Sequence, residues 1–296
     1  MKKKIVILGC ENSHASLFLR FIKYNPKYSN VEVLGVYSDE EAPAQRLHER
    51  FGVYVMKSYD EFVGQVDGVV NTARDGANRY KYVKPYMEAG VPMFLDKPVC
   101  IGEEEALEFM REAKKYGVKV TGGSSLKHDE GVKTIIKKVQ ENENGKTCGG
   151  LVRSSIEFLS QYSGYYFYAQ HFVDVATVAF GRYPNSVMTY KPNKEWQKGD
   201  TATVVINYDN YAVTATIYEE GGHYFVGRLS EKNFEGYDIL IDTPIFLAEW
   251  EEFYELLMGG EQKESNEDFI SPVFVMEAAM RSFESGKEEK VNRFKL

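Results

Sequence analysis

The spacing of apolar and polar positions alternates between two periods over the first 120 residues. Short runs rich in β-branched residues occur at 4–9, 31–37, 68–72, 93–96 and 118–122. Stretches with apolar residues at helical spacing lie between them, at 13–24, 40–51, 80–89 and 102–116. Three of the short runs are almost continuously apolar, as are strands that are covered on both faces. The alternation predicts an α/β domain built on a doubly wound parallel sheet.

The pattern changes after residue 122. A helical stretch at 129–141 leads through a polar segment to a strand-like run at 151–158 and a helical stretch at 168–180. Consecutive strand-like runs then follow at 186–190, 202–208, 212–218, 223–229 and 237–242, and helical stretches at 246–258 and 271–284 end the sequence. Asp209 and Asn210 separate two alternating runs, which predicts a tight hairpin. We therefore expect a domain at 1–121 and a C-terminal α+β domain with a mostly antiparallel open sheet at 122–296.

Composition narrows the class of protein. The 296 residues carry 36 Lys and Arg against 44 Asp and Glu, a formal net charge of −8. Binding to nucleic acid or to an anionic membrane surface needs clustered cations, so we expect neither kind of partner. No apolar run approaches the ~18 residues of a membrane span, and the apolar stretch 5–8 is shorter than the ~7–15 residues of a signal peptide core.

Three cysteines, Cys10, Cys100 and Cys148, show no spacing typical of a metal site or a disulfide scaffold. Such a set fits a reducing compartment, so we expect a cytoplasmic protein without a Cys-based metal site.

The first strand-like run ends in GCENSH, residues 9–14, where a helix begins. In dinucleotide-binding domains the pyrophosphate rests at such a helix N-terminus, over a glycine-rich turn. Only the first glycine of that fingerprint is present, because Glu11 takes the place of the second and His14 lies near the third. The candidate cofactor-binding residues are Gly9, Glu11, Asn12, Ser13 and His14. A plain turn in which Asn12 or Ser13 caps the helix explains the same residues.

A ribose-binding acid is expected after the second strand. Ser38 stands at the usual acid position and Asp39 follows it. Asp39 could accept a hydrogen bond from a ribose hydroxyl, whereas Ser38 would leave room for the 2′-phosphate of NADP. Both NAD and NADP therefore remain possible cofactors, and a solvated turn is an equally good account of the two residues.

Lys97 follows the apolar run at 93–96, at an expected strand end in the parallel sheet. Ligands of such sheets collect at the carboxyl ends of the strands. Pro98 favours an extended conformation at Lys97, which would aim its ammonium group. Beside Asp96, Lys97 is a candidate for electrostatic or proton-handling chemistry. The alternative is a surface lysine in a salt bridge.

His171 and Asp174 lie three residues apart in a helical stretch, so their side chains share one face. No third ligand has a spacing suited to a metal site. A structural histidine is the alternative to a functional one. Tyrosines crowd the preceding segment, and Tyr162, Tyr165 and Tyr166 are candidates for stacking against a ring-shaped ligand. Core packing would also explain them, because aromatic residues dominate protein cores.

The order of these parts resembles the Gfo/Idh/MocA family, which includes glucose–fructose oxidoreductase and inositol dehydrogenase. Asp96, Lys97 and Pro98 look like the family's Glu-Lys-Pro signature, and EAG at 88–90 precedes that strand. His171, Asp174 and Gly181 are similar to its HxxD…G helix. The closing segment EAAMRSFESGKEEKV also matches, so the resemblance runs almost from end to end.

The resemblance implies a Rossmann domain and an NAD- or NADP-dependent oxidoreductase acting on a hydroxyl of a sugar, polyol or related small molecule. Lys97 would polarise the reacting oxygen and His171 would act as general base, the two converging on one cavity. Asp174, His128 and the three tyrosines would contact the substrate. The cofactor would also be contacted by Thr72, Ala73, Arg74, Asp96 and Lys97.

The sequence departs from the family pattern at several positions. Phe167 stands where an Asp usually precedes the histidine, and Thr72-Ala73 replaces Thr-Pro. The arginine that is common after the sixth strand is absent from residues 122–128. We hypothesise that Arg74 or Arg79 supplies phosphate or substrate contacts instead. Two alternatives are a non-catalytic sensor that binds a dinucleotide or a sugar, and a reductase similar to biliverdin reductase.

The open sheet expected in the second half has a face that needs cover. Val204, Ile206, Val213 and Ile217 alternate along two strands, and an apolar patch of this size is unusual on a monomer. We therefore expect a homodimer or homotetramer that forms through this sheet.

Overall fold

A computed structural model describes residues 2–296 and divides the chain into two compact units. The first comprises the chain up to Gly123 together with Phe246–Asn266 and the final residue, and the second comprises Ser124–Ile245 and Glu267–Lys295. Each unit has its own sheet, and each is described by itself.

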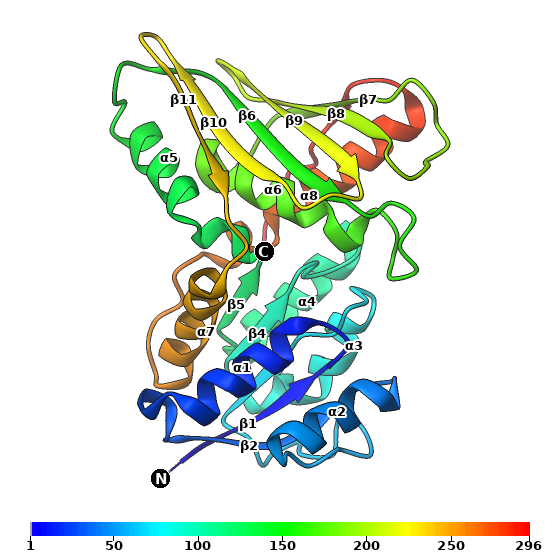
Figure 1. Ribbon diagram of the computed structural model, residues 1–296, viewed down its shortest axis with the longest axis vertical. Helices are drawn as coiled ribbons and strands as arrows, with labels where there is room; N and C mark the ends of the chain where they lie inside the picture. The colour runs from blue at the N-terminus through cyan, green and yellow to red at the C-terminus, as the bar shows by residue number, and fades with distance from the viewer. Residues whose placement is uncertain (1) are drawn as a thin grey trace. The chain divides into compact units, whose positions relative to one another are not determined.

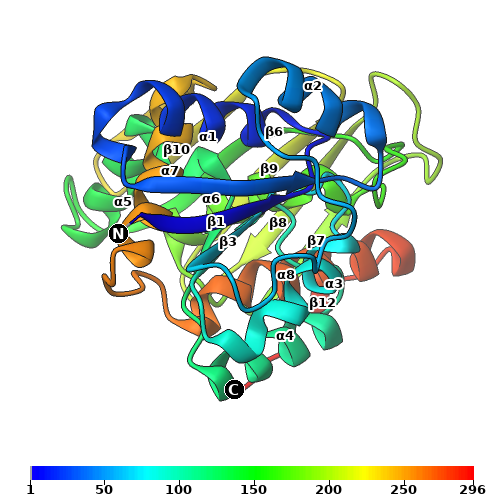
Figure 2. The same ribbon diagram turned by 90° about the horizontal axis from the view of Figure 1, so that it is seen from below.

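The first unit is built on five parallel strands in the order β2-β1-β3-β4-β5. The strands are β1 Lys3–Leu8, β2 Val31–Tyr37, β3 Gly68–Asn71, β4 Met93–Asp96 and β5 Val120–Gly123. The helices are α1 Ser13–Tyr24, α2 Glu41–Phe51, α3 Asn78–Val83 and α4 Glu103–Tyr116, with short 3-10 turns at η1 Pro26–Tyr28 and η2 Lys84–Ala89. Figure 2 shows α1 and α2 on one face of this sheet and α3 and α4 on the other. The predicted doubly wound parallel sheet is confirmed.

The strand order of the first unit reverses beside β1. The chain leaves β1 for β2 on one side, whereas β3, on the other side of β1, continues to β4. The connections from these two adjacent strand ends therefore run in opposite directions. In open α/β sheets such a switch point opens a crevice for ligands. The first unit therefore has its candidate site at the ends of β1 to β4.

One segment of the second half of the chain completes the first unit. Helix α7, Thr243–Leu257, places Trp250, Phe253 and Leu257 in one buried apolar cluster with Phe18 of α1 and Phe94 of β4. The predicted division into 1–121 and 122–296 therefore differs from the structure, where Phe246–Asn266 returns to the first unit. The apolar face of α7 covers sheet positions that α1 and α2 leave open.

The second unit has a sheet of seven strands in the order β11-β10-β6-β9-β8-β7-β12. Its strands are β6 Thr147–Ile156, β7 Ser186–Tyr190, β8 Thr201–Asn207, β9 Ala212–Glu219, β10 Tyr224–Ser230, β11 Phe234–Ile239 and β12 Glu289–Lys290. Only β6 and β9 pair in parallel among these strands. The helical elements are η3 Ser125–His128, α5 Glu130–Gln140, α6 Tyr166–Phe180 and α8 Asn266–Ser285. The predicted mostly antiparallel sheet is confirmed, and Figure 1 shows the helices gathered on one of its faces.

Several predicted boundaries were wrong, among them those of the last long strand and of the last helix. The last long strand, expected at 237–242, is β11, Phe234–Ile239. The last helix, expected from residue 271, begins at Asn266 and carries Pro272 in its second turn. Pro272 has no N–H to donate to Asp268 O, and this carbonyl accepts instead from the hydroxyl of Ser271 at 3.0 Å.

The four apolar residues expected on an open face are covered. Val204, Ile206, Val213 and Ile217 are each at most 1% exposed. Val213 pairs with Gly150, where a Cβ atom would lie 2.6 Å from the ring of Phe180 of α6. Thr189 pairs with Val204 and donates its hydroxyl to Ala279 O of α8 at 2.9 Å, so α6 and α8 cover this face of the sheet. The prediction that these four side chains share one apolar face was correct. Helices of this chain, and not a second copy, cover that face. A homodimer or homotetramer stays a prediction, but these four buried residues no longer support it.

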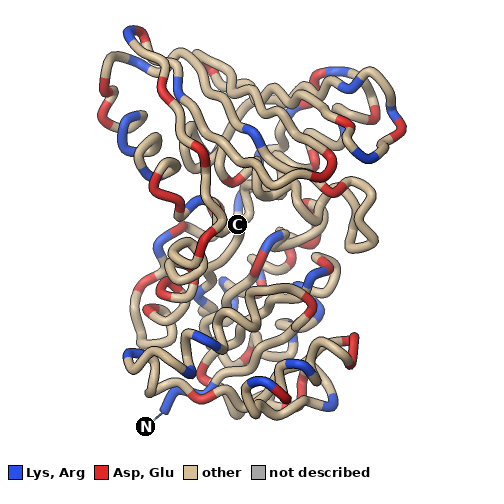
Figure 3. The backbone as a smooth tube through the Cα atoms, in the orientation of Figure 1, with Lys and Arg blue, Asp and Glu red and all other residues tan. Residues whose placement is uncertain are grey.

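Charged positions of both signs are spread over each unit, as Figure 3 shows. Within residues 2–296 no helix has the length and apolar character needed to cross a membrane. In the same range no group of three or more His, Cys, Asp or Glu side chains could hold a metal ion, and Cys10, Cys100 and Cys148 are all free thiols.

Candidate functional site

Gly9 ends β1 at a point where two segments of backbone approach closely. A Cβ atom at Gly9 would lie 2.1 Å from both Cα and N of Ala73, and its φ of +85° is one that side chains rarely adopt. Thr72 joins the same two segments, because its N–H donates to Leu8 O at 2.7 Å and its hydroxyl donates to Gly9 O. The first glycine of the fingerprint is therefore required by the packing of β1 against the loop after β3.

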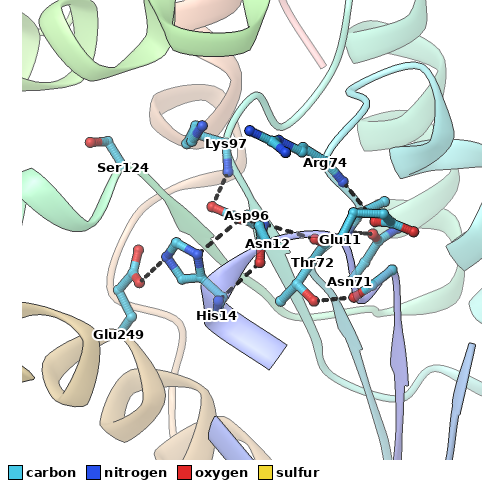
Figure 4. Close-up of polar contacts among 12 residues, drawn as sticks. Glu11, Asn12, His14, Asn71, Thr72, Arg74, Asp96, Lys97, Ser124 and Glu249 are labelled. Carbon is cyan, nitrogen blue, oxygen red and sulfur yellow. Dashed lines mark hydrogen bonds and ion pairs between the residues drawn. The ribbon is translucent and has the colours of Figure 1, made fainter. Parts of the chain in front are cut away.

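Asn12 connects the start of α1 to two other strand ends. Its Oδ1 accepts from His14 N at 2.9 Å and caps the helix. Its Nδ2 donates to Thr72 O at 2.9 Å and to Asp96 Oδ2 at 2.7 Å (Figure 4). The cap that the sequence predicted as an alternative is confirmed, and the same side chain fixes the loops after β1, β3 and β4. Ser13, the first residue of α1, is exposed.

Lys97 is held by its backbone on both sides. Its N–H donates to Asp96 Oδ1 at 2.7 Å, and its carbonyl accepts from Arg79 Nη2 at 2.6 Å. The Lys97–Pro98 peptide bond is cis. Lys97 is 7% exposed, so the alternative of a surface salt-bridge lysine was wrong. These two hydrogen bonds fix the backbone of Lys97 and therefore the position of its Cα and Cβ atoms.

Arg79 does not supply the external contact that we hypothesised for it. It is fully buried, and besides Lys97 O it donates to Pro98 O at 3.0 Å and to Asn71 Oδ1 at 3.1 Å. Burial lowers the pKa of the guanidinium from its ordinary value, against the raising effect of Asp96. Arg79 is a positioning residue for Lys97. Arg74, in the loop between β3 and α3, is half-buried and stays a candidate for a phosphate or substrate contact.

His14 is buried between two carboxylates. Nδ1 lies 3.3 Å from Asp96 Oδ2 and Nε2 lies 3.3 Å from Glu249 Oε2, on α7 (Figure 4). Burial acts to lower the pKa of the imidazole, but the two carboxylates outweigh it and the pKa of His14 is raised. The prediction that His14 contacts the cofactor does not fit this placement, because its N–H and both ring nitrogens face groups of the protein. No sequence pattern pointed to Glu249, which lies far from α1 along the chain.

Glu11 extends from the turn after β1 across two neighbouring strand ends. Its Oε1 accepts from the hydroxyl of Ser38 after β2, and its Oε2 accepts from Arg74 N after β3 at 3.1 Å. Ser38 Oγ in turn accepts from Glu40 N at 3.1 Å. Figure 4 shows Glu11 and Arg74 side by side. Glu11 and Ser38, two predicted cofactor-binding residues, thus meet directly.

Asp39 lies beside a group of tyrosines. Its Oδ1 accepts from the hydroxyl of Tyr37 at 2.6 Å, and Lys81 lies 3.8 Å from its Oδ2. Partial burial acts to raise the pKa of this carboxyl, but hydrogen bonds from Tyr37 and Tyr82 lower it below its usual value.

In the second unit, His171 is held by Ser124. Ser124 Oγ lies 2.6 Å from His171 Nδ1, and Ser124 N donates to Asp174 Oδ2 at 2.7 Å. Gln170 Nε2 also donates to Asp174 Oδ2, at 3.0 Å. The two predicted residues on α6 are brought together through a serine that the sequence analysis missed, because a single buried serine carries no pattern. Asp174 positions this serine, and its contact with a substrate stays a prediction.

The tyrosines before α6 are only partly available to a ligand. Tyr165 is 5% exposed, with its hydroxyl 3.4 Å from Met276 O, and burial raises its pKa well above the ordinary value. The expectation of an exposed stacking surface was therefore wrong for Tyr165. Tyr166 is half-buried and donates to Glu277, and Tyr162 packs its ring 5.8 Å from that of Phe167. His128 is half-buried at the end of η3.

The first part of the chain matches a family of known proteins. Residues 3–124 match the family model GFO_IDH_MocA, described as "Oxidoreductase family, NAD-binding Rossmann fold". No curated protein sequence matches the chain.

Solved structures share the fold over nearly the whole chain at low sequence identity. GenD2 from gentamicin A biosynthesis, in complex with NAD, is 15% identical with a TM-score of 0.85, covering 99% of this chain and 97% of its own. A myo-inositol dehydrogenase from Corynebacterium glutamicum is 16% identical with a TM-score of 0.82, covering 99% and 100%. The WlbA dehydrogenase from Chromobacterium violaceum, in complex with NADH and UDP-GlcNAcA, is 16% identical with a TM-score of 0.79, covering 99% and 97%. The family model thus covers the first part of the chain, residues 3–124, and the solved structures show that the likeness in fold extends over the rest.

Proposed function

We propose that the chain is an NAD- or NADP-dependent dehydrogenase or reductase that transfers a hydride between the nicotinamide and a hydroxyl or carbonyl carbon of a sugar, polyol or related small molecule. The observation that carries the proposal is Lys97. This buried lysine stands at the carboxyl end of a parallel strand, and Asp96 and Arg79 fix its backbone. Burying an ammonium group costs free energy, so a built site around it favours a functional role.

The proteins of similar fold support the same class of substrate. One acts on myo-inositol by its name, and another was solved with NADH and a UDP-linked sugar acid. These ligands share a ring that carries several hydroxyl groups. A small polyhydroxylated ring is therefore the substrate class that we propose for this chain.

The residues at the strand ends fit a dinucleotide by the chemistry of their donors. Ser13 is exposed at the N-terminus of α1, where backbone amides favour an anion, and the guanidinium of Arg74 lies in the loop after β3. These are the groups that would hold the pyrophosphate. When bound, the nicotinamide supplies the acceptor or donor of the hydride.

Lys97 and His171 are the two groups that we assign to the reaction itself. The ammonium of Lys97 would stabilise negative charge on the reacting oxygen. We assign the ring proton of His171 to Nδ1, where it is donated to Ser124 Oγ, so that Nε2 presents a lone pair as general base. The expectation that both groups meet at one cavity stays a prediction.

The test is cofactor binding followed by turnover. Titration with NADH and with NADPH, monitored by nicotinamide fluorescence, measures binding. Absorbance at the nicotinamide band then measures turnover with inositols, sugars and UDP-linked sugar acids. We expect turnover by the wild type, and a loss of about 10²- to 10⁴-fold in kcat for His171→Ala with cofactor affinity unchanged. Failure to bind either cofactor would contradict the proposal.

A second candidate function is a sensor of the same fold that binds a dinucleotide or sugar without turnover. Phe167 favours it, because this buried side chain stands where the resemblance expects a carboxylate beside the histidine. Cofactor binding without turnover on any member of the substrate panel would support the sensor. Phe167→Asp gives a sharper comparison, because a gain of turnover would show that only this carboxylate was missing.

A further inference from the structure

We propose that Glu11 supplies the carboxylate that binds the adenosine ribose, and that it makes the domain select NAD over NADP. The inference rests on the proposed function, since it requires that the first unit bind a dinucleotide. It assigns the choice of cofactor to a residue of the β1 turn instead of to the end of β2.

The argument begins with the position of the missing acid. In dinucleotide-binding domains an Asp or Glu at the end of the second strand accepts a hydrogen bond from the ribose 2′-hydroxyl. Here that position holds Ser38, which is uncharged. Glu11 extends from the neighbouring strand end and accepts the hydroxyl hydrogen of Ser38. A carboxylate is therefore present at position 38, although the residue encoded there is a serine.

The contacts of Glu11 hold this carboxylate in one orientation. Ser38 donates to Oε1 and the backbone of Arg74 donates to Oε2, from opposite sides of β1. A carboxylate oxygen has lone pairs for two hydrogen bonds, so each oxygen retains capacity for a ribose hydroxyl. A group fixed in advance loses little freedom on binding.

Asp39 is the weaker candidate for the same role. Its Oδ1 accepts from Tyr37 at 2.6 Å, Lys81 lies 3.8 Å from Oδ2, and its side chain is 46% exposed. Its lowered pKa reflects partners that the carboxylate already has, with hydrogen bonds from Tyr37 and Tyr82 overcoming the effect of burial. A ribose hydroxyl would have to compete with both tyrosines.

The charges around the end of β2 oppose a 2′-phosphate. Besides Glu11 and Asp39, Glu40 precedes α2 and Glu41 occupies its first turn, whereas Lys81 is the cation paired there with Asp39. NADP carries a phosphate on the hydroxyl that the ribose of NAD leaves free. Placing that phosphate beside these carboxylates would bring like charges together, which disfavours its binding.

The experiment measures dissociation constants for NADH and NADPH, by nicotinamide fluorescence, for the wild type and for Glu11→Gln. Glu41→Gln is the control, since it removes one exposed charge near the same strand end. We expect the wild type to bind NADH at least tenfold more tightly than NADPH. Glu11→Gln should weaken NADH binding about tenfold or more, because the ribose hydroxyl loses a charged hydrogen-bond acceptor. It should strengthen NADPH binding, because a like charge beside the 2′-phosphate is removed. The control should leave the ratio of the two constants nearly unchanged.

A rescue variant distinguishes a specific effect of Glu11→Gln from misfolding of the variant protein. Ser38→Asp in the Glu11→Gln background restores a carboxylate at the end of β2 and should recover the preference for NADH. Equal gains in both affinities on Glu11→Gln would show that Glu11 only repels the pyrophosphate and would overturn the inference. Loss of NADH binding in Asp39→Asn instead would also overturn it, with the proposed function intact. A wild type that binds neither cofactor would overturn both.

Discussion

Nε2 of His14 lies 3.3 Å from Oε2 of Glu249, and both side chains are buried within the first unit. Asp96, on the other side of the ring, also positions the backbone of Lys97. The imidazole therefore connects helix α7 to the strand end that carries the proposed catalytic lysine. Its protonation should affect the stability of that connection.

We predict that His14 makes the stability of the protein depend on pH. Its pKa in the folded state is raised above the unfolded value of about 6.5, so its stabilising contribution is complete below that pH and is lost as the pH rises through the folded pKa. Urea unfolding of the wild type and of His14→Gln, from pH 5.5 to 8.5, measures the difference. The free energy of unfolding of the wild type should exceed that of His14→Gln by the largest amount at the lowest pH. A difference that stays constant over this range would contradict a charged His14.

Gly9→Ala should destabilise the protein by several kcal/mol, because the new Cβ would overlap the backbone of Ala73. Gly52→Ala is the matched control, since Gly52 also has a positive φ, +75°, but open space around it. The control should cost only the ~1–2 kcal/mol of a left-handed residue. Thermal or urea unfolding of the two variants separates close packing from backbone strain. If both variants lost the same free energy of unfolding, the close approach of Gly9 to Ala73 would not be what requires a glycine at position 9.

Ser124→Ala should change the tautomer of His171. We expect Nδ1 to carry the proton in the wild type, and the population to shift toward protonated Nε2 when the partner hydroxyl is removed. Nitrogen-15 NMR of the five histidines reports both ring nitrogens. Ser125→Ala, which removes the next hydroxyl along the chain, should leave the His171 signals in place. An unaltered His171 spectrum in Ser124→Ala would show that Ser124 does not set the tautomer.

Trp250→Ala should cost about 3–5 kcal/mol of unfolding free energy, as do other truncations of large buried aromatics. Trp250 is fully buried, and its ring lies 5.5 Å from that of Phe18 and 5.8 Å from that of Phe253. Trp250→Phe preserves part of this packing and should cost less. Urea unfolding measures both. A loss under 1 kcal/mol for the alanine variant would mean that α7 contributes little to this core.

The parallel sheet could be predicted because its strands are short, continuously apolar and separated by helices of clear period. Lys97 could be singled out for the same reason, since a strand end in such a sheet is a place for ligands. These inferences use local patterns, and local patterns were sufficient for them.

The remaining parts of the site depend on contacts between distant positions. The spacing of apolar residues predicted that α7 is a helix with an apolar face. It did not predict that this face packs into the core of the first unit. Glu249 contacts His14 and Ser124 contacts His171 from distant positions in the sequence, and such contacts leave no periodic pattern. Arg79 lies in α3 and has a positioning role instead of the predicted phosphate or substrate contact, because a sequence does not show whether a guanidinium turns outward or into the protein.

The return of Phe246–Asn266 to the first unit has a consequence for synthesis on the ribosome. Domains usually fold in the order in which they emerge, the N-terminal one first. Here the parallel sheet would emerge early with Phe18 and Phe94 lacking their partners on α7, and it would wait for almost the whole chain before that cover arrives. A nascent chain stalled before residue 246 would therefore expose apolar surface and be a target for chaperones, although all five of its sheet strands had already been made.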